Sequence, residues 1–200
     1  MSRSLKIIVA DDELDMRDYF KHILPLLGHQ VTGAAENGRE LVELCAADPP
    51  DLVITDIKMP DMDGIDAATQ IYRKAAVPVI LVSAYHDQDF IRRAEADHIM
   101  AYLVKPIKQS DLEPAIAIAM RRFEQFQALR KETADLKQAL EDRKVIEKAK
   151  GIMMKKAELD ENEAFRRLQK LASDRNRKLI DIAHMILTAE EALQKPARGS

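Results

Sequence analysis

The sequence predicts an α/β domain with a parallel sheet over residues 1–120, followed by an all-helical segment. In the first part, short apolar runs alternate with stretches whose apolar residues recur at helical spacing. From Ser110 onward strand-like runs are absent, and neither Pro nor Gly occurs between Pro114 and Gly151. Apolar residues make up 46% of the chain and charged residues 32%, so the chain can bury hydrophobic cores and lacks the composition of a disordered protein.

Five short apolar runs are the expected strands. Most are too uniformly apolar for a sheet with one face in water, so we expect helices on both faces. Helical spacing over Met16–Leu27 and Gly38–Ala47 indicates two of the covering helices. Five strands and five helices in about 120 residues match the doubly wound, flavodoxin-like plan. The expected strands are Lys6–Ala10, Val31–Ala34, Leu52–Thr55, Val79–Val82 and Tyr102–Val104.

A long helix is expected to follow over residues 111–143, with Pro114 tolerated in its first turn. Steps of alternately three and four residues from Leu112 to Arg143 meet mostly apolar side chains, which is the heptad pattern of a coiled coil. We therefore expect a homodimer formed through this helix. The alternative is a long helix that folds back on the first domain.

Three amphipathic patterns fill the C-terminal part and predict a small helical bundle. They cover residues 145–153, 164–172 and 179–187. Asp160, with Glu163 three residues later, is the expected capping box at the start of the second helix.

Composition excludes several classes of protein. The single cysteine, Cys45, rules out an intramolecular disulfide framework and a cysteine-built zinc site, which fits a reducing compartment. The longest apolar stretch, Val77–Ala84, is far too short to span a membrane, and Asp11 and Asp12 interrupt any signal-peptide core. A cytoplasmic protein with no membrane partner is expected, with a disordered tail at residues 195–200.

Charge is unevenly distributed along the chain. Acidic residues outnumber basic ones over residues 1–120, and basic residues outnumber acidic ones over residues 121–200. A basic helical end is typical of proteins that bind nucleic acid, and also of ordinary solvated helices.

Polar side chains stand at the carboxyl ends of the expected strands. Asp11 and Asp12 follow the first strand, Asp56 follows the third, and Ser83 and Lys105 end the fourth and fifth. In a doubly wound sheet these ends share the edge where ligands bind. Three carboxylates favour Mg²⁺, and an aspartate nucleophile with a nearby lysine and hydroxyl suits phosphoryl transfer. Helix capping explains one aspartate, but not the whole set.

Four motifs in this order resemble the receiver domains of bacterial response regulators: IVADDE, VITDIKMPDMDG, ILVSAY and AYLVKP. The resemblance covers residue 5 to about residue 120, and implies that Asp56 accepts a phosphoryl group from a histidine kinase. It implies that the chain catalyses only its own aspartyl phosphorylation and dephosphorylation, and is otherwise not an enzyme. Gly64 is expected to supply backbone freedom in the turn after Asp56.

The same resemblance assigns roles to the residues of the expected site. Tyr102 is implied as a switch that turns inward when Ser83 moves toward the phosphate, and the bond before Pro106 is expected to be cis. The implied Mg²⁺ ligands are Asp11 (largely through water), Asp12, Asp56 and the backbone carbonyl of Lys58, and the phosphoryl-binding and switch residues are Ser83, the Ala84 N–H, Tyr102 and Lys105.

The motifs LKQALEDRKVIEKAKGIMMKK and EAFRRLQKLASDRNRKLIDIAHMIL resemble the ANTAR family of RNA-binding antitermination domains, placed here at residues 130–194. The resemblance implies a dimer that binds paired hairpins in a nascent transcript and prevents a terminator from forming. Gly151 lies inside a helix, and close packing of another helix is the preferred reason, with an RNA backbone as the alternative. Phe165 is assigned to the core. The expected RNA-binding residues are Arg143, Lys144, Lys148, Lys150, Gly151, Arg175, Asn176, Arg177 and Lys178.

Two other outputs stay open at this point. The last two helices, joined through Ser173, Asp174 and Arg175, allow a DNA-binding helix-turn-helix reading. DNA is disfavoured because the last helix is expected to bury most of its apolar residues, which leaves few side chains for a major groove. The helical end is also compatible with docking of a protein partner.

Overall fold

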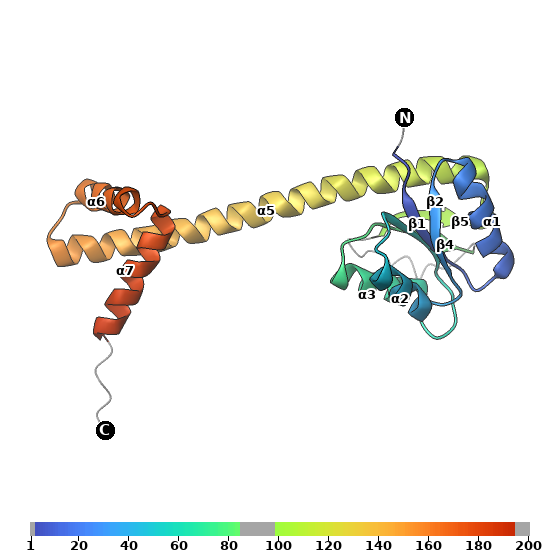
Figure 1. Ribbon diagram of the computed structural model, residues 1–200, viewed down its shortest axis with the longest axis horizontal. Helices are drawn as coiled ribbons and strands as arrows, with labels where there is room; N and C mark the ends of the chain where they lie inside the picture. Colours follow the sequence, from blue (N-terminus) through green and yellow to red (C-terminus); the bar gives the residue numbers. More distant parts are fainter. Residues whose placement is uncertain (1–2, 85–98, 195–200) are drawn as a thin grey trace, which may run out of the picture. The chain divides into compact units, whose positions relative to one another are not determined.

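The computed structural model describes residues 3–84 and 99–194, and the chain divides into two compact units between Ala128 and Leu129. The first unit contains a five-stranded sheet with strand order β2-β1-β3-β4-β5 (Figure 1). Every pairing of neighbouring strands is parallel, which confirms the predicted flavodoxin-like plan. The strands are β1 (Lys6–Ala10), β2 (Gln30–Ala35), β3 (Leu52–Asp56), β4 (Val79–Ser83) and β5 (Ile99–Val104).

Successive residues of a strand point to opposite faces of the sheet, so the apolar strands make both faces hydrophobic. Helices cover both of these faces. Ile7 and Val9 of β1 belong to one buried cluster, and Ile8 and Ala10 belong to the other. The helices α2 (Gly38–Ala47) and α3 (Gly64–Lys74) close the second cluster. The fourth of the five expected helices lies outside the described residues.

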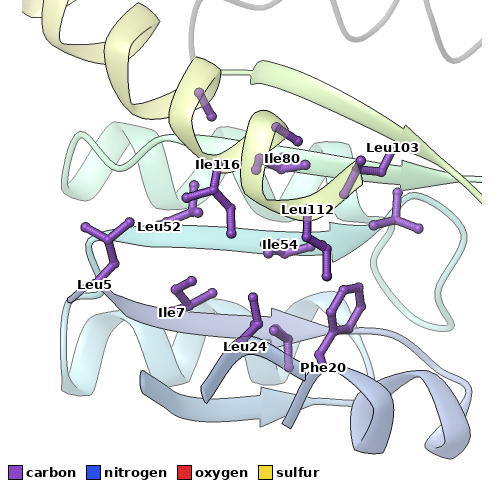
Figure 2. Packing of buried hydrophobic residues seen from close by; sticks show 14 of the residues in the cluster. Leu5, Ile7, Phe20, Leu24, Leu52, Ile54, Ile80, Leu103, Leu112 and Ile116 are labelled. Carbon is purple, nitrogen blue, oxygen red and sulfur yellow. The ribbon is translucent and has the colours of Figure 1, made fainter. Parts of the chain in front are cut away.

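The other face carries most of the largest fully buried side chains of this unit, Phe20 among them. It is closed by α1 (Leu14–Leu26) and by the first turns of α5 (Gln109–Ala157). Burying a leucine, isoleucine or phenylalanine of this kind stabilises the fold by about 1.5–3 kcal/mol. Figure 2 shows strand residues Ile7, Ile54 and Ile80 packed with Phe20 and Leu24 of α1 and with Leu112 and Ile116 of α5.

The heptad pattern on α5 is buried where it begins, at Leu112, and exposed further along the helix. Leu112 and Ala119 are fully buried in the core of the first unit. This part of the pattern therefore packs against the sheet. The later members of the pattern, Leu129, Leu136 and Leu140, are 62%, 65% and 55% exposed.

The second unit is built from the C-terminal part of α5 with α6 (Glu161–Asp174) and α7 (Leu179–Gln194). The first of the three amphipathic patterns is continuous with the long helix, because no helix-breaking residue or cap separates them. The expected capping box is confirmed, since Asp160 Oδ1 accepts from the Glu163 N–H at 2.8 Å, and the Glu163 carboxylate accepts from the Asp160 N–H at 3.3 Å. The core residues are Ala149, Leu168, Ala172, Ile182 and Ala183.

The assignment of Phe165 to the core was wrong, since its side chain is 38% exposed. Ala164 and Leu168 lie four residues apart and face the core, while Phe165 is rotated about 100° from Ala164 around the helix. A partly exposed ring is thus present on α6.

Within the described ranges, no helix combines the length and the apolar character needed to cross a bilayer. Cys45 is a free, buried cysteine on α2. The predicted tail at residues 195–200 lies outside the part of the chain that the structure describes.

Candidate functional site

The carboxyl ends of β1, β3 and β5 bring two aspartates and a lysine together. Asp11 directly follows β1, Asp56 is the last residue of β3, and Lys105 directly follows β5. The Lys105 Nζ atom lies 3.0 Å from Asp11 Oδ2, 3.1 Å from Asp56 Oδ1 and 3.2 Å from Glu13 Oε1. Three carboxylates therefore surround a single ammonium group, which has three N–H donors to share among them.

Burial and charge oppose each other in this group. Burial raises the pKa of Asp56 and the Asp11 carboxylate adds to the rise, while Lys105 and the Lys58 N–H act in the opposite direction. Burial lowers the pKa of Lys105, but the hydrogen bonds and charges of Asp11 and Asp56 outweigh this effect and raise it above its ordinary value. Lys105 is therefore a permanent cation beside Asp56 at neutral pH.

The backbone around Asp56 fixes the position of its carboxylate. The Lys58 N–H donates to Asp56 Oδ2 at 2.7 Å, and the Thr55 hydroxyl donates to Asp56 O at 3.0 Å. A Cβ atom added to Gly64 would lie 2.0 Å from Asp56 O. Gly64 is therefore required for space beside Asp56, and the expectation that it supplies backbone freedom is corrected, since its φ is not positive.

The acidic turn after β1 suits a hard cation. The carboxylates of Asp11, Asp12 and Glu13 offer ligand oxygens within 4.8 Å of one another. Asp11 Oδ2 is buried and accepts no well-aligned hydrogen bond from any described residue, although the Lys105 ammonium balances its charge as an ion pair. An under-coordinated carboxylate oxygen among further carboxylates is the donor set that Mg²⁺ prefers.

Two residues of this turn were missed by the sequence reasoning. Glu13 completes the acidic group and contacts Lys105. Arg17 Nη1 donates to Asp11 O at 2.7 Å and to Asp12 O at 3.0 Å. The run of three acids from Asp11 was a visible signal for Glu13, whereas a guanidinium bound to backbone carbonyls has no sequence signal.

Most of the expected RNA-binding residues lie on the surface of the second unit, but Lys150 does not. Lys150 is buried, and its Nζ lies 2.6 Å from Glu147 Oε2 and 2.8 Å from Glu161 Oε1. The hydrogen bonds that the Lys150 ammonium donates to Glu147 and Glu161 raise the pKa of Lys150. Lys150 thus joins α5 to the first turn of α6. The exposed members of the set are Arg143, Lys144, Lys148, Arg175, Asn176, Arg177 and Lys178.

Gly151 borders an open groove between α5 and α7. An added Cβ atom at Gly151 would meet nothing within 4 Å, so the expectation of close packing against another helix of the chain was wrong. The groove has a volume of about 430 Å³. Its lining combines basic, apolar and acidic side chains: Lys148, Gly151, Ile152, Lys155, Lys156, Leu187, Glu190 and Glu191.

Asn176 has a backbone role at the end of α6. Its φ of 49° lies in the left-handed region, which asparagine tolerates better than most residues. The Asn176 N–H donates to Ser173 O at 3.0 Å and the Arg177 N–H donates to Ala172 O at 2.9 Å, which is the Schellman pattern of a helix end.

Comparison with known protein families agrees with both halves of this description. The model of the response regulator receiver domain matches residues 7–117. The chain belongs to the response regulator receiver family. The ANTAR domain model matches residues 134–187, so this response regulator joins a receiver to an ANTAR output domain.

Relatives and solved structures agree with the receiver assignment. The transcriptional regulatory protein PdtaR of Mycobacterium tuberculosis is 41% identical over 182 residues, which cover 91% of this chain and 89% of PdtaR. The regulatory protein AtoC of Escherichia coli is 34% identical over 68% of this chain and 28% of its own length. The crystal structure of a response regulator receiver domain protein from Clostridium thermocellum is 31% identical, with a TM-score of 0.54 over 60% of this chain and 96% of that chain.

Within the receiver, the residues expected to bind the phosphoryl group lie at the same sheet edge as Asp56. Ser83 ends β4, and its hydroxyl donates to the Ala84 carbonyl at 2.8 Å. The Lys105 N–H donates to Ser83 O at 2.9 Å, which ties the ends of β4 and β5 together. Tyr102 is 43% exposed on β5, and the peptide bond between Lys105 and Pro106 is cis, as expected.

Proposed function

We propose that this response regulator accepts a phosphoryl group on Asp56 from a histidine kinase, and that its ANTAR domain then binds paired RNA hairpins in nascent transcripts and prevents termination. The observation that carries this proposal is the Asp56–Lys105–Asp11 group in the same chain as a basic ANTAR output. The protein acts in the cytoplasm, where both the kinase domain and the transcript are found.

The geometry at Asp56 supports transfer to its carboxylate. One carboxylate oxygen forms a bond to phosphorus as the bond from phosphorus to the kinase's histidine nitrogen breaks, and the imidazole leaves with the electron pair. Bound Mg²⁺ supplies neutralising charge to the phosphoryl oxygens. The Lys105 ammonium already lies at the acceptor carboxylate, and the Lys58 N–H holds its other oxygen. The proposed cation ligands are Asp11, Asp12, Asp56 and the Lys58 carbonyl.

The switch residues complete this part of the proposal. Ser83 and the Ala84 N–H bind the phosphoryl oxygens, and Tyr102 turns inward from its exposed position as Ser83 moves. Apart from this self-phosphorylation and the hydrolysis of the acyl phosphate, the chain catalyses no reaction.

The exposed leucines of α5 support a homodimer. Leu129, Leu136 and Leu140 continue the heptad pattern at solvent-exposed positions. In a parallel, in-register pair, Glu132 of one copy lies opposite Lys137 of the other at the g and e positions, which is an attractive contact. An antiparallel pair brings together e positions that are all basic, namely Arg130, Lys137 and Lys144.

The surface of the ANTAR domain supports an RNA partner. Exposed Arg and Lys side chains bind phosphates and release counterions, so affinity is expected to fall steeply with salt. The open groove at Gly151 admits close approach of a backbone. Two such domains in one dimer gain avidity for two linked hairpins.

A gel-shift titration tests the proposal. The full chain is titrated against a two-hairpin RNA and a duplex DNA of the same length, with and without Mg²⁺ plus beryllofluoride, which mimics the acyl phosphate. We expect RNA binding that the mimic tightens, and no such response in Asp56→Asn. Lys148→Glu is expected to weaken RNA binding, whereas Lys131→Glu, an exposed lysine of α5 outside the ANTAR match, serves as the matched charge control.

The other outcomes separate the alternatives. RNA binding that ignores the mimic keeps the RNA partner and contradicts phosphorylation control. Binding to the duplex DNA alone supports a DNA-binding regulator. Binding to neither nucleic acid contradicts the RNA proposal and supports docking of a protein partner.

A further inference from the structure

The junction between β1 and α1 leaves two backbone carbonyls without helical partners. The helix α1 begins at Leu14, and the Arg17 N–H donates to Glu13 O at 3.2 Å as its first helical bond. Glu13 is the N-cap, and its side chain makes no capping hydrogen bond. The carbonyls of Asp11 and Asp12 lie before this first bond, so their acceptors must be satisfied from elsewhere.

Arg17 supplies that donor from one turn into the helix. A single nitrogen, Nη1, carries two hydrogens and donates to both Asp11 O at 2.7 Å and Asp12 O at 3.0 Å. The guanidinium therefore holds the two peptide groups on either side of Asp12. The Glu13 N–H donates to Asp11 Oδ1 at 3.0 Å and holds the same turn from the other side.

We propose that Arg17 is a positioning residue for the cation site, and that it acts by fixing the backbone that carries the Asp11 and Asp12 carboxylates. This inference rests on the proposed Mg²⁺-dependent phosphorylation of Asp56. Arg17 contacts carbonyl oxygens, so its role is exerted through the two aspartates and not on the cation itself. Groups that orient metal ligands in this way typically change metal affinity by at least tenfold when removed.

A purely electrostatic role for Arg17 predicts the opposite result. A cation near the site repels Mg²⁺, so removal of the Arg17 charge would tighten Mg²⁺ binding, by about twofold for a solvent-screened pair. A positioning role predicts weaker binding, because the carboxylates lose their fixed geometry. The sign of the change in affinity therefore distinguishes the two roles.

The test is a titration of the full chain with Mg²⁺, in which binding is monitored by the amide chemical shifts of the receiver. Arg17→Met keeps the apolar stem and removes the donors, and we expect Mg²⁺ to bind about tenfold more weakly. Arg17→Lys keeps the positive charge but removes the guanidinium nitrogen that reaches both carbonyl groups. We expect this variant to bind Mg²⁺ about threefold more weakly, or worse. Lys21→Met removes a charge one turn further along α1, where Lys21 pairs with Asp18 at 3.2 Å, and is expected to stay within twofold of wild type.

Unchanged or tighter Mg²⁺ binding in Arg17→Met overturns the inference, and so does wild-type affinity in Arg17→Lys, which decides the matter if Arg17→Met does not fold. Wild-type protein that binds no Mg²⁺ overturns the proposed function together with the inference. Wild-type protein that binds Mg²⁺ with the same affinity as both Arg17 variants overturns the inference alone.

Discussion

Replacement of Gly64 with alanine places a methyl group where the receiver has room only for a hydrogen atom. The added Cβ would lie 2.0 Å from Asp56 O, 3.0 Å from Asp56 C and 3.0 Å from Thr55 Oγ1. Because the closest atoms are backbone, the chain must move by about 1 Å, and overpacking of this kind costs about 1–3 kcal/mol of unfolding free energy. Since Asp56 itself moves, we also expect phosphorylation to slow by about 100-fold.

Two measurements on the full chain check this prediction. Urea unfolding followed by far-UV circular dichroism gives the loss of stability, and labelling by a small acyl phosphate in the presence of Mg²⁺ gives the rate at Asp56. Gly151→Ala is the matched control, since its added Cβ meets nothing within 4 Å. That variant is expected to gain up to about 1 kcal/mol of helix stability and to be phosphorylated at the wild-type rate.

Two results would refute the reasoning at different steps. Wild-type stability in Gly64→Ala would show that the turn after Asp56 relaxes without cost, which contradicts the close-approach argument. Reduced stability with a wild-type phosphorylation rate would show that the strain is absorbed away from the Asp56 carboxylate.

Three further predictions concern groups outside the phosphoacceptor site. Asn176→Gly is expected to retain wild-type stability, because glycine also adopts the left-handed backbone at the end of α6. Asn176→Val is expected to lose about 1 kcal/mol or more of unfolding free energy in urea. Equal stability of the two variants would contradict the backbone role. Burial raises the pKa of Cys45 to about 12, so iodoacetamide at pH 8 is expected to label the thiol only in urea, and rapid labelling of the native chain would refute its burial. Burial lowers the pKa of His29, although Glu113 opposes the effect, and the unfolded chain therefore takes up the proton first. The stability that neutral His29 provides is complete above the pKa of the unfolded chain, about 6.5, and is lost as the pH falls toward the lower pKa of the folded chain. The urea midpoint should therefore fall more between pH 7 and pH 5.5 in wild type than in His29→Asn.

The sheet and its ligand edge were predictable because uniform apolar runs allow few alternatives. β1 was predicted at the bounds that the structure shows, and β3 and β4 extend each run by one residue to Asp56 and Ser83. β5 begins earlier than expected, at Ile99, and all six of its residues are apolar, although only Met100 and Leu103 are buried. Once the strands were placed, parallel topology brought their carboxyl ends together.

The long helix shows where a sequence pattern is ambiguous. A heptad pattern records which residues are buried and not what buries them. Leu112 and Ala119 satisfy that pattern by packing on the sheet, while Leu136 has the same spacing and is exposed. The sequence alone has no means of separating a helix that covers a sheet from one that pairs with a second copy.

Charged residues that act on backbone or on one another were the least predictable part of both sites. Arg17 binds carbonyl groups, which every residue has, so no partner could be recognised from sequence spacing. A lysine is usually a surface residue, but Lys150 is buried and its ammonium group pairs with Glu161 on the next helix. Such contacts depend on how two helices or strands pack together, and a single sequence carries little information on that packing.

The three carboxylates around Lys105 have a consequence for the chemical event itself. Because the carboxylates of Asp11, Glu13 and Asp56 already lie within 3.2 Å of the Lys105 Nζ atom, a phosphoryl oxygen that arrives in the proposed reaction must compete with them for this cation. The proposed phosphorylation would then exchange partners at one nitrogen, with the phosphoryl oxygen taking the place of a carboxylate. Glu13 is the most solvent-exposed of the three and is solvated at the least cost when it leaves. The proposed modification would thus first change the partners of Lys105, and the Glu13 side chain is the partner expected to leave.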